Sequence, residues 1–276
     1  MGERKAKLAR LGRRAGVLAA LLCASCAGGK TVPELATRSP AERATAFDRV
    51  ADLAGQDGDG AVAERLYRRA IADRPGWAEP QIGLGHLLLR RGDLDAARAA
   101  FEKAAQLAPG DGRPVAGLAA IALTEHRPDA ALAGYARALA LTPGDAWALN
   151  GSGVALDQLG RHAEAQARYR EILARDPEDR AAKNNLGLSL ALDGRAVEAV
   201  PLLSALAEGP AATPRNRQNL ALALALVGRD RDAVAAASAD EAPSVAQADV
   251  ALLAVLRQGV QAAPAPVSTP DPAPPS

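Results

Sequence analysis

Cysteine and aromatic residues are scarce in this sequence of 276 residues. The only two cysteines, Cys23 and Cys26, lie near the N-terminus, and only seven residues are phenylalanine, tyrosine or tryptophan. The sequence after Cys26 therefore has no disulfide framework, no thiol nucleophile and no cysteine metal site. Few aromatic residues, with abundant alanine, leucine and arginine, favour helix packing over an all-β core.

The sequence also lacks a strong net charge. Lysine and arginine number 33, aspartate and glutamate number 32, and residues 1–14 hold six of the basic residues and one of the acidic ones. Without that segment, 27 basic and 31 acidic residues remain, a net charge of −4. A mildly acidic protein does not have the basic surface that nucleic-acid binding requires, so we expect no nucleic-acid partner.

Motifs for catalysis are not recognisable either. The sequence contains no P-loop, no Gly-rich dinucleotide motif and no Gly-x-Ser-x-Gly elbow. The three histidines, His86, His126 and His162, fall at different positions of the repeats described below, so repeat stacking does not bring them together. We therefore expect no enzyme, no catalytic or metal site, no cofactor and no small-molecule substrate.

The first 25 residues have the features of a secretory signal peptide. A basic segment (residues 1–14) precedes an apolar run (residues 15–22) and then small residues around Cys26. The run is much shorter than the roughly 20 residues that a membrane-spanning helix needs. Ala24-Ser25-Cys26 resembles the lipobox of bacterial lipoproteins, although Cys23 replaces the usual leucine. This resemblance implies lipidation at Cys26.

A lipid at Cys26 would anchor the chain to a membrane, since each buried CH₂ contributes about 0.8 kcal/mol and several acyl chains give stable binding. Ala27 after the cysteine resembles the pattern of outer-membrane lipoproteins. We therefore expect a cell-envelope protein that faces the periplasm from the outer membrane. The alternative is ordinary cleavage, for example after Ala27, which would release a soluble secreted protein.

A period of 34 residues runs through the middle of the sequence. Four prolines recur at this spacing: Pro75, Pro109, Pro143 and Pro177. Six alanines do the same: Ala63, Ala97, Ala131, Ala165, Ala199 and Ala233. One large-residue position holds four of the seven aromatic residues and then a leucine: Tyr67, Phe101, Tyr135, Tyr169 and Leu203. A fixed period of this length indicates stacked supersecondary units.

Within one period, the spacing predicts a helix over residues 79–91, a turn at Gly92, and a second helix over residues 94–107 capped by Asp93. We expect Gly85 and Ala97 to face each other and Phe101 to fill the core. The His126-Arg127-Pro128 segment replaces the turn glycine of the third repeat. This order of small, aromatic, small and proline residues resembles the tetratricopeptide repeat, which implies an all-α, right-handed solenoid of about six repeats.

We expect five regions along the chain: a signal peptide (1–25), a lipidated cysteine with a flexible tether (26–43), the solenoid (44–238), a capping helix (239–260) and a disordered tail (261–276). The tail is rich in proline and alanine and cannot form a core. The capping helix would span Ser244 to Gln258 and cover the end of the stack.

The resemblance also implies where a partner binds. The first helix of each repeat would line a concave groove that takes peptides or helices of other proteins. Amides, one arginine and apolar residues occupy these positions: Trp147, Asn150, Val154, Asn184, Asn185, Leu188, Leu192, Arg215, Gln218, Asn219 and Leu222. Amides could bind the main chain of an extended peptide. Alternatively, they could simply bond one another between adjacent repeats. Co-chaperones of this family bind a carboxylate with several lysines and arginines at these groove positions. Here Lys183 is almost the only such residue, which disfavours a carboxylate clamp.

Residues 217–223 (RQNLALA), Gly228-Arg229 and Ala233 resemble the end of TadD-like lipoproteins of the Tad (Flp) pilus assembly system, although an asparagine expected in the last helix is missing. The resemblance implies a scaffold that binds pilus or secretion components. Two alternatives remain open: a pilotin-like lipoprotein for a type IV pilus secretin, and an adaptor for a cell-envelope enzyme.

Overall fold

The computed structural model describes residues 39–56 and 58–262, and the chain divides into two compact units, residues 1–109 and 110–276. Within the described residues the structure is all-α, with no strand. The regions expected to be a signal peptide, a tether at Cys26 and a disordered tail lie outside the described residues up to residue 38 and from residue 263. None of the described helices is both long and apolar enough to cross a bilayer.

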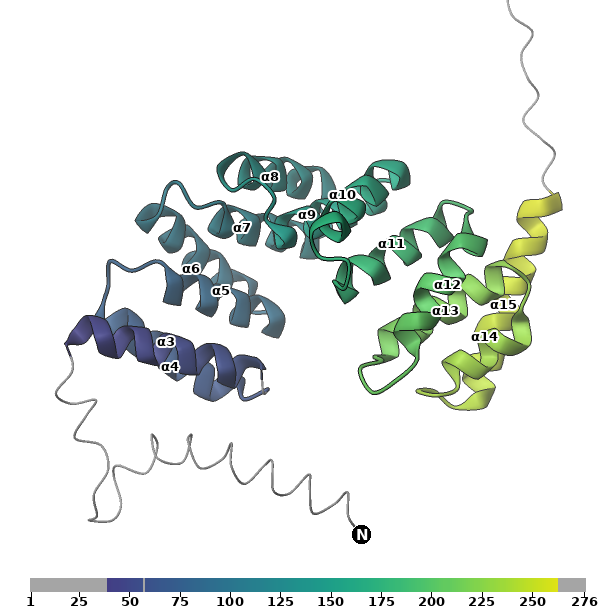
Figure 1. Ribbon diagram of the computed structural model, residues 1–276, viewed down its shortest axis with the longest axis horizontal. Coiled ribbons are helices and arrows are strands. Elements are labelled where there is room, and N and C mark those ends of the chain that lie inside the picture. The colour runs from purple at the N-terminus through teal and green to yellow at the C-terminus, as the bar shows by residue number, and fades with distance from the viewer. Residues whose placement is uncertain (1–38, 57, 263–276) are drawn as a thin grey trace, which may run out of the picture. The chain divides into compact units, whose positions relative to one another are not determined.

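The first unit contains two helix pairs, shown in purple and blue in Figure 1. Its helices are α3 (Pro40–Gln56), α4 (Gly60–Asp73), α5 (Glu79–Arg91) and α6 (Leu94–Leu107). Helix α3 packs on α4 and α5 packs on α6, while α4 and α3 both contact α5. The bounds of α5 and α6 are those expected from the sequence.

The second unit continues the same pattern with four helix pairs and a last single helix. Its helices are α7 (Gly112–Thr124), α8 (Pro128–Leu141), α9 (Ala146–Gln158), α10 (His162–Arg175), α11 (Arg180–Leu192), α12 (Ala196–Ala207), α13 (Pro214–Leu226), α14 (Asp230–Ala237) and α15 (Pro243–Ala262). In this pattern the first helix of each pair also contacts the first helix of the next, as α9 does with α11 and α11 with α13.

The repeated small and large residues form the core of both units, as expected. All six alanines of the 34-residue series are 0% exposed, and Tyr67, Phe101, Tyr135 and Tyr169 are at most 5% exposed. The ring of Phe101, rather than Ala97, is the nearest side chain to Gly85, since a Cβ atom on Gly85 would lie 2.6 Å from that ring. The small residue is therefore needed to admit the ring of its own repeat.

The turns show how the 34-residue spacing of the helix pairs is kept where the turn glycine is replaced by His126. Gly92 ends α5 in the left-handed region at φ 79°, and the Asp93 side chain accepts a hydrogen bond from the backbone N–H of Ala96 to begin α6. His126 occupies the equivalent place between α7 and α8 and adopts the same conformation, with φ 56°. A non-glycine residue rarely takes this conformation, so the stacked helices impose it at some cost.

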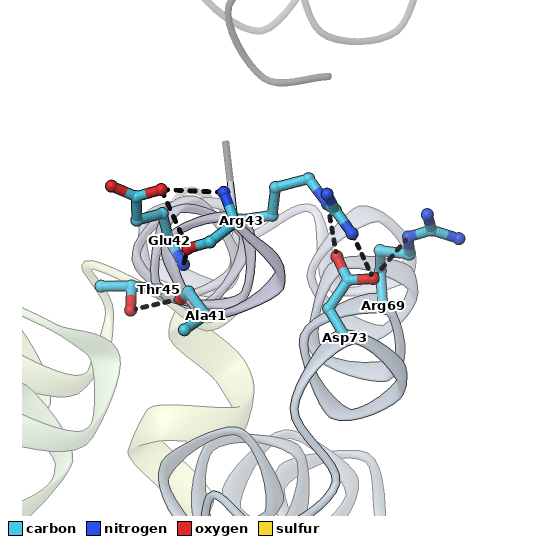
Figure 2. Close-up of polar contacts among 7 residues, drawn as sticks. Ala41, Glu42, Arg43, Thr45, Arg69 and Asp73 are labelled. Carbon is cyan, nitrogen blue, oxygen red and sulfur yellow. Dashed lines mark hydrogen bonds and ion pairs between the residues drawn. The ribbon is translucent and has the colours of Figure 1, made fainter. Parts of the chain in front are cut away.

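Helix α3 begins earlier than the sequence interpretation placed the solenoid, at Pro40 rather than residue 44. Ser39 and Glu42 form a reciprocal pair: Ser39 N–H donates to Glu42 Oε2 at 2.8 Å, and Glu42 N–H donates to Ser39 Oγ at 3.3 Å. A serine followed three residues later by glutamate is a capping box, with Pro40 in the favoured first helical position. Figure 2 shows Arg43 of α3 and Arg69 of α4 converging on Asp73.

The C-terminal end also differs in its bounds from the expectation. Helix α14 is short, with eight residues, and α15 spans 20 residues, starting at Pro243 and continuing to Ala262. Residues 261 and 262, which were expected in the tail, are therefore helical. Ala246 and Val250 are the buried residues by which α15 covers the end of the second unit.

Candidate peptide-binding surface

A concavity of about 530 Å³ lies within the second unit. Its walls come from α9, α11 and α13, the first helices of three successive repeats, and from Tyr169 of α10. Nine of the residues singled out from the sequence line it: Asn150, Val154, Asn184, Asn185, Leu188, Leu192, Arg215, Gln218 and Asn219. The 34-residue register places these side chains together because equivalent positions of neighbouring repeats stack.

Two of the expected groove residues do not line the concavity. Trp147 is 37% exposed and packs edge-on against Tyr135, with ring centroids 6.4 Å apart. Leu222 is half-buried on α13. Three lining residues were missed in the sequence: Asp157, Gln158 and Tyr169. The sequence places Tyr169 in the core, where it is 0% exposed, and does not indicate that it also lines the concavity.

The asparagines form a ladder that joins three repeats. Asn185 Nδ2 donates to Asn150 Oδ1 at 2.8 Å, and Asn219 Nδ2 donates to Asn184 Oδ1 at 3.0 Å. Each of these bonds joins residues 35 positions apart, so the same contact is made twice by successive repeats. Asn184 Nδ2 connects the two bonds by donating to Asn185 Oδ1 at 3.2 Å. The amides therefore bond one another between repeats.

Asn184 is the centre of this ladder and is not a surface residue. It is 4% exposed, and its Oδ1 also accepts from Asn216 Nδ2 at 2.9 Å. Asn216 is buried and forms the capping box of α13 with Thr213. Among the described residues, the ladder leaves the amide nitrogen of Asn150 and the amide oxygen of Asn219 without a partner. Polar capacity for a ligand therefore remains at its two ends.

An acidic group at the side of the concavity is already satisfied. Asp157 accepts hydrogen bonds from Ser189 Oγ at 2.6 Å and from the Tyr169 hydroxyl at 2.9 Å. The Nδ1 atom of His162 lies 2.9 Å from Asp157 Oδ1. Burial, followed by the negative charge of Asp157, raises the pKa of the Tyr169 hydroxyl, which therefore stays protonated and donates. This cluster joins α9, α10 and α11 and holds the wall in place.

Two family models described as tetratricopeptide repeat match the sequence, one at residues 117–167 and 152–217 and the other at residues 56–121. Together they cover residues 56–217, more than half of the chain. The chain belongs to the tetratricopeptide repeat family. No curated protein matches the sequence. Tetratricopeptide repeat proteins bind peptides or other proteins.

Solved structures share this tetratricopeptide repeat fold at low sequence identity. A chain of the APC/C hetero-tetramer Cut9–Hcn1 has a TM-score of 0.67 and 18% identity over 79% of this chain and 44% of its own length. PilF of Pseudomonas aeruginosa has a TM-score of 0.58 and 17% identity over 82% of this chain and 99% of its own. A thermophilic TPR protein of Thermus thermophilus has a TM-score of 0.59 and 19% identity over 66% and 98%. The chain thus spans less than half of the first of these structures.

The first unit of this tetratricopeptide repeat protein has a smaller concavity, of about 390 Å³, lined by residues that include Tyr67, His86 and Arg90. The Tyr67 hydroxyl donates to Asp52. His86 lies edge-on to the Phe101 ring, with centroids 5.2 Å apart. None of the amide ladder recurs there, since Ile82 and Gly83 stand at the ladder positions. No group of three metal-binding side chains is found in the described parts of either unit.

Proposed function

We propose that this protein is a non-enzymatic scaffold lipoprotein that holds partner proteins in the concavity of its second unit. The observation that carries this proposal is the surface formed by α9, α11 and α13, where exposed apolar groups lie beside an amide ladder. Leu192 is 51% exposed there, so its apolar side chain is accessible to a partner. An exposed leucine beside amides with free polar capacity can take both a side chain and the main chain of an extended segment.

The partners we propose are components of a Tad (Flp) pilus or a related secretion machine. The support is the resemblance of residues 217–223, Gly228-Arg229 and Ala233 to the end of TadD-like lipoproteins. These residues lie on α13 and α14 and the turn between them. Gln218 and Asn219, two of the residues in this segment, line the concavity, so the stretch that carries the resemblance also contributes to the proposed site.

The proposed location is the outer membrane, with the folded units facing the periplasm and a lipid on Cys26 as the anchor. The support is the signal peptide pattern followed by Ala24-Ser25-Cys26. Labelling of cells with palmitate should mark the wild-type chain and not the Cys26→Ser variant. Equal label in both chains would remove the lipoprotein proposal and leave a secreted scaffold.

The binding proposal is tested by crosslinking in the native host, followed by identification of the captured proteins. The variant Leu192→Lys places a charge in the concavity, whereas Val197→Lys places one on α12, where Val197 is 77% exposed and outside the concavity. Both positions are exposed, so neither variant should change helicity. We expect Leu192→Lys to lose the partner and Val197→Lys to keep it. Equal capture by both variants would place binding elsewhere.

The identity of the captured protein then separates the proposed machine from its alternatives. A pilus ATPase or a small pilin supports Tad pilus assembly, whereas a type IV pilus secretin alone supports a pilotin role. A cell-wall enzyme supports the adaptor role. A gene cluster containing a pilus ATPase, a secretin and a small pilin would favour the first of these.

A further inference from the structure

One basic side chain in the proposed binding surface has no partner. Arg215 is exposed in the first turn of α13 and lines the concavity, and none of the described residues hydrogen-bonds or ion-pairs with it. Other basic side chains in the first half of α11 and α13 are engaged: Arg217 with Asp240, Lys183 with Glu178, and Arg180 with the carbonyls of Leu206 and Ala211. Arg215 is therefore the free positive charge of this wall.

The position of Arg215 does not favour the stability of α13. The first turn is the positive end of the helix dipole, where a cation is repelled and an anion is attracted. The α13 N-terminus is already capped by Thr213 and Asn216, so Arg215 is not needed to satisfy it. The carboxylate of the concavity, Asp157, already accepts hydrogen bonds from Ser189 and Tyr169. Arg215 is therefore the charged side chain of the lining that has no partner among the described residues.

Resting on the proposed function above, we propose that the partner segment is an extended, apolar internal peptide with an aspartate or glutamate side chain that pairs with Arg215. Its apolar side chains would contact Leu188 and Leu192, and its main chain would bond Asn150 and Asn219 at the ends of the ladder. Packed helix axes lie about 8–10 Å apart, so the path across three first helices is about 20 Å. An extended chain of about six residues spans that distance at about 3.3 Å per residue.

The test uses the purified full chain and fluorescein-labelled octapeptides with leucine at alternate positions and one acidic residue near one end. Three versions carry an internal glutamate with an amidated C-terminus, an internal glutamine with an amidated C-terminus, or an internal glutamine with a free C-terminal carboxylate. We expect the glutamate peptide to bind about threefold to tenfold more tightly than the amidated glutamine peptide, because an exposed ion pair contributes a modest gain. Raising the salt concentration should reduce the difference.

Arg215→Gln should abolish this preference, and Arg231→Gln is the matched control. Arg231 is also exposed and without a partner among the described residues, but it lies on α14 outside the concavity. Its loss should leave the glutamate preference unchanged. Because Arg215 opposes the helix dipole, Arg215→Gln should not lower the thermal midpoint, so lost binding cannot be assigned to unfolding.

Several outcomes would overturn the proposal. Equal binding of the glutamate and amidated glutamine peptides by the wild-type chain refutes the acidic preference, and so does an equal effect of the two arginine variants. A preference for the free C-terminal carboxylate alone would show that a chain end, not a side chain, is bound. If no peptide binds while Leu192→Lys still loses the crosslinked partner in the host, this inference fails and the proposed function stands. If that variant keeps the partner, the proposed function fails as well.

Discussion

Replacing Asn184 with alanine would remove the central side chain of the amide ladder. Its Oδ1 accepts from Asn216 and Asn219, and its Nδ2 donates to Asn185. Alanine leaves the buried Asn216 amide without an acceptor, and an unsatisfied buried donor costs about 1–3 kcal/mol. Loss of the bond from half-buried Asn219 adds about 0.5–1.5 kcal/mol. We therefore expect the free energy of unfolding to fall by about 2–4 kcal/mol.

Thermal and urea denaturation followed by circular dichroism would measure this loss. A fall of this size in a unit of about 150 residues lowers the thermal midpoint by roughly 10 °C. Asn150→Ala is the matched control, because Asn150 is half-buried at the end of the ladder and accepts one bond, from Asn185. Water can replace that bond, so the control should cost about 1 kcal/mol or less.

A double-mutant cycle isolates the bond between repeats. Combining Asn184→Ala with Asn219→Ala should cost less than the sum of the two single variants, with a coupling of about 0.5–1.5 kcal/mol. If Asn184→Ala lowers the free energy of unfolding no more than Asn150→Ala does, the ladder does not stabilise the stack. The asparagines would then be available for a ligand, and the assignment of Asn184 to an internal role would be wrong.

Three further predictions concern other parts of the fold. Burial, then the nearby Asp52 and Glu79 charges, raise the pKa of Asp48 to about 6. The stability contributed by the protonated form is therefore complete below the unfolded pKa near 3.8 and is lost as pH rises through about 6. Asp48→Asn should therefore raise the free energy of unfolding at pH 8 and leave it unchanged at pH 4. The gain at pH 8 should be only about 1 kcal/mol, because solvent reaches half-buried Asp48. Urea titration at both pH values measures this difference. His126→Gly should raise the thermal midpoint by a few degrees. At a φ of 56° histidine is strained by about 1 kcal/mol, whereas glycine adopts this φ without strain. An unchanged or lower midpoint would contradict this prediction. Gly151→Ala should lower the urea midpoint, since the added Cβ would lie 2.2 Å from the buried Tyr135 ring and overpacking costs about 1–3 kcal/mol; a more stable variant would show that the ring can move.

The spacing of residues along the chain determined the class of fold, the core and most of the wall of the candidate site. A period of 34 residues places Phe101 and its equivalents at one position of each repeat, and a position that recurs in a stack has the same neighbours each time. The turn at Gly92 and the cap at Asp93 were equally clear, because both depend on a residue and its immediate neighbours. Ser39-Pro40-Ala41-Glu42 was an equally local signal for the start of α3 and was overlooked.

Which groove side chains remain available to a partner was decided by the tertiary structure. In sequence, Asn184, Asn150 and Arg215 are similar polar residues at concave positions, and nothing local separates them. Asn184 is not available to a partner because its amide oxygen accepts hydrogen bonds from Asn216 and Asn219 of the next repeat. Arg215, in contrast, forms no hydrogen bond or ion pair with the described residues. Hydrogen bonds between repeats depend on distances of about 3 Å between atoms more than 30 residues apart, and periodicity sets the positions of helices without setting those distances.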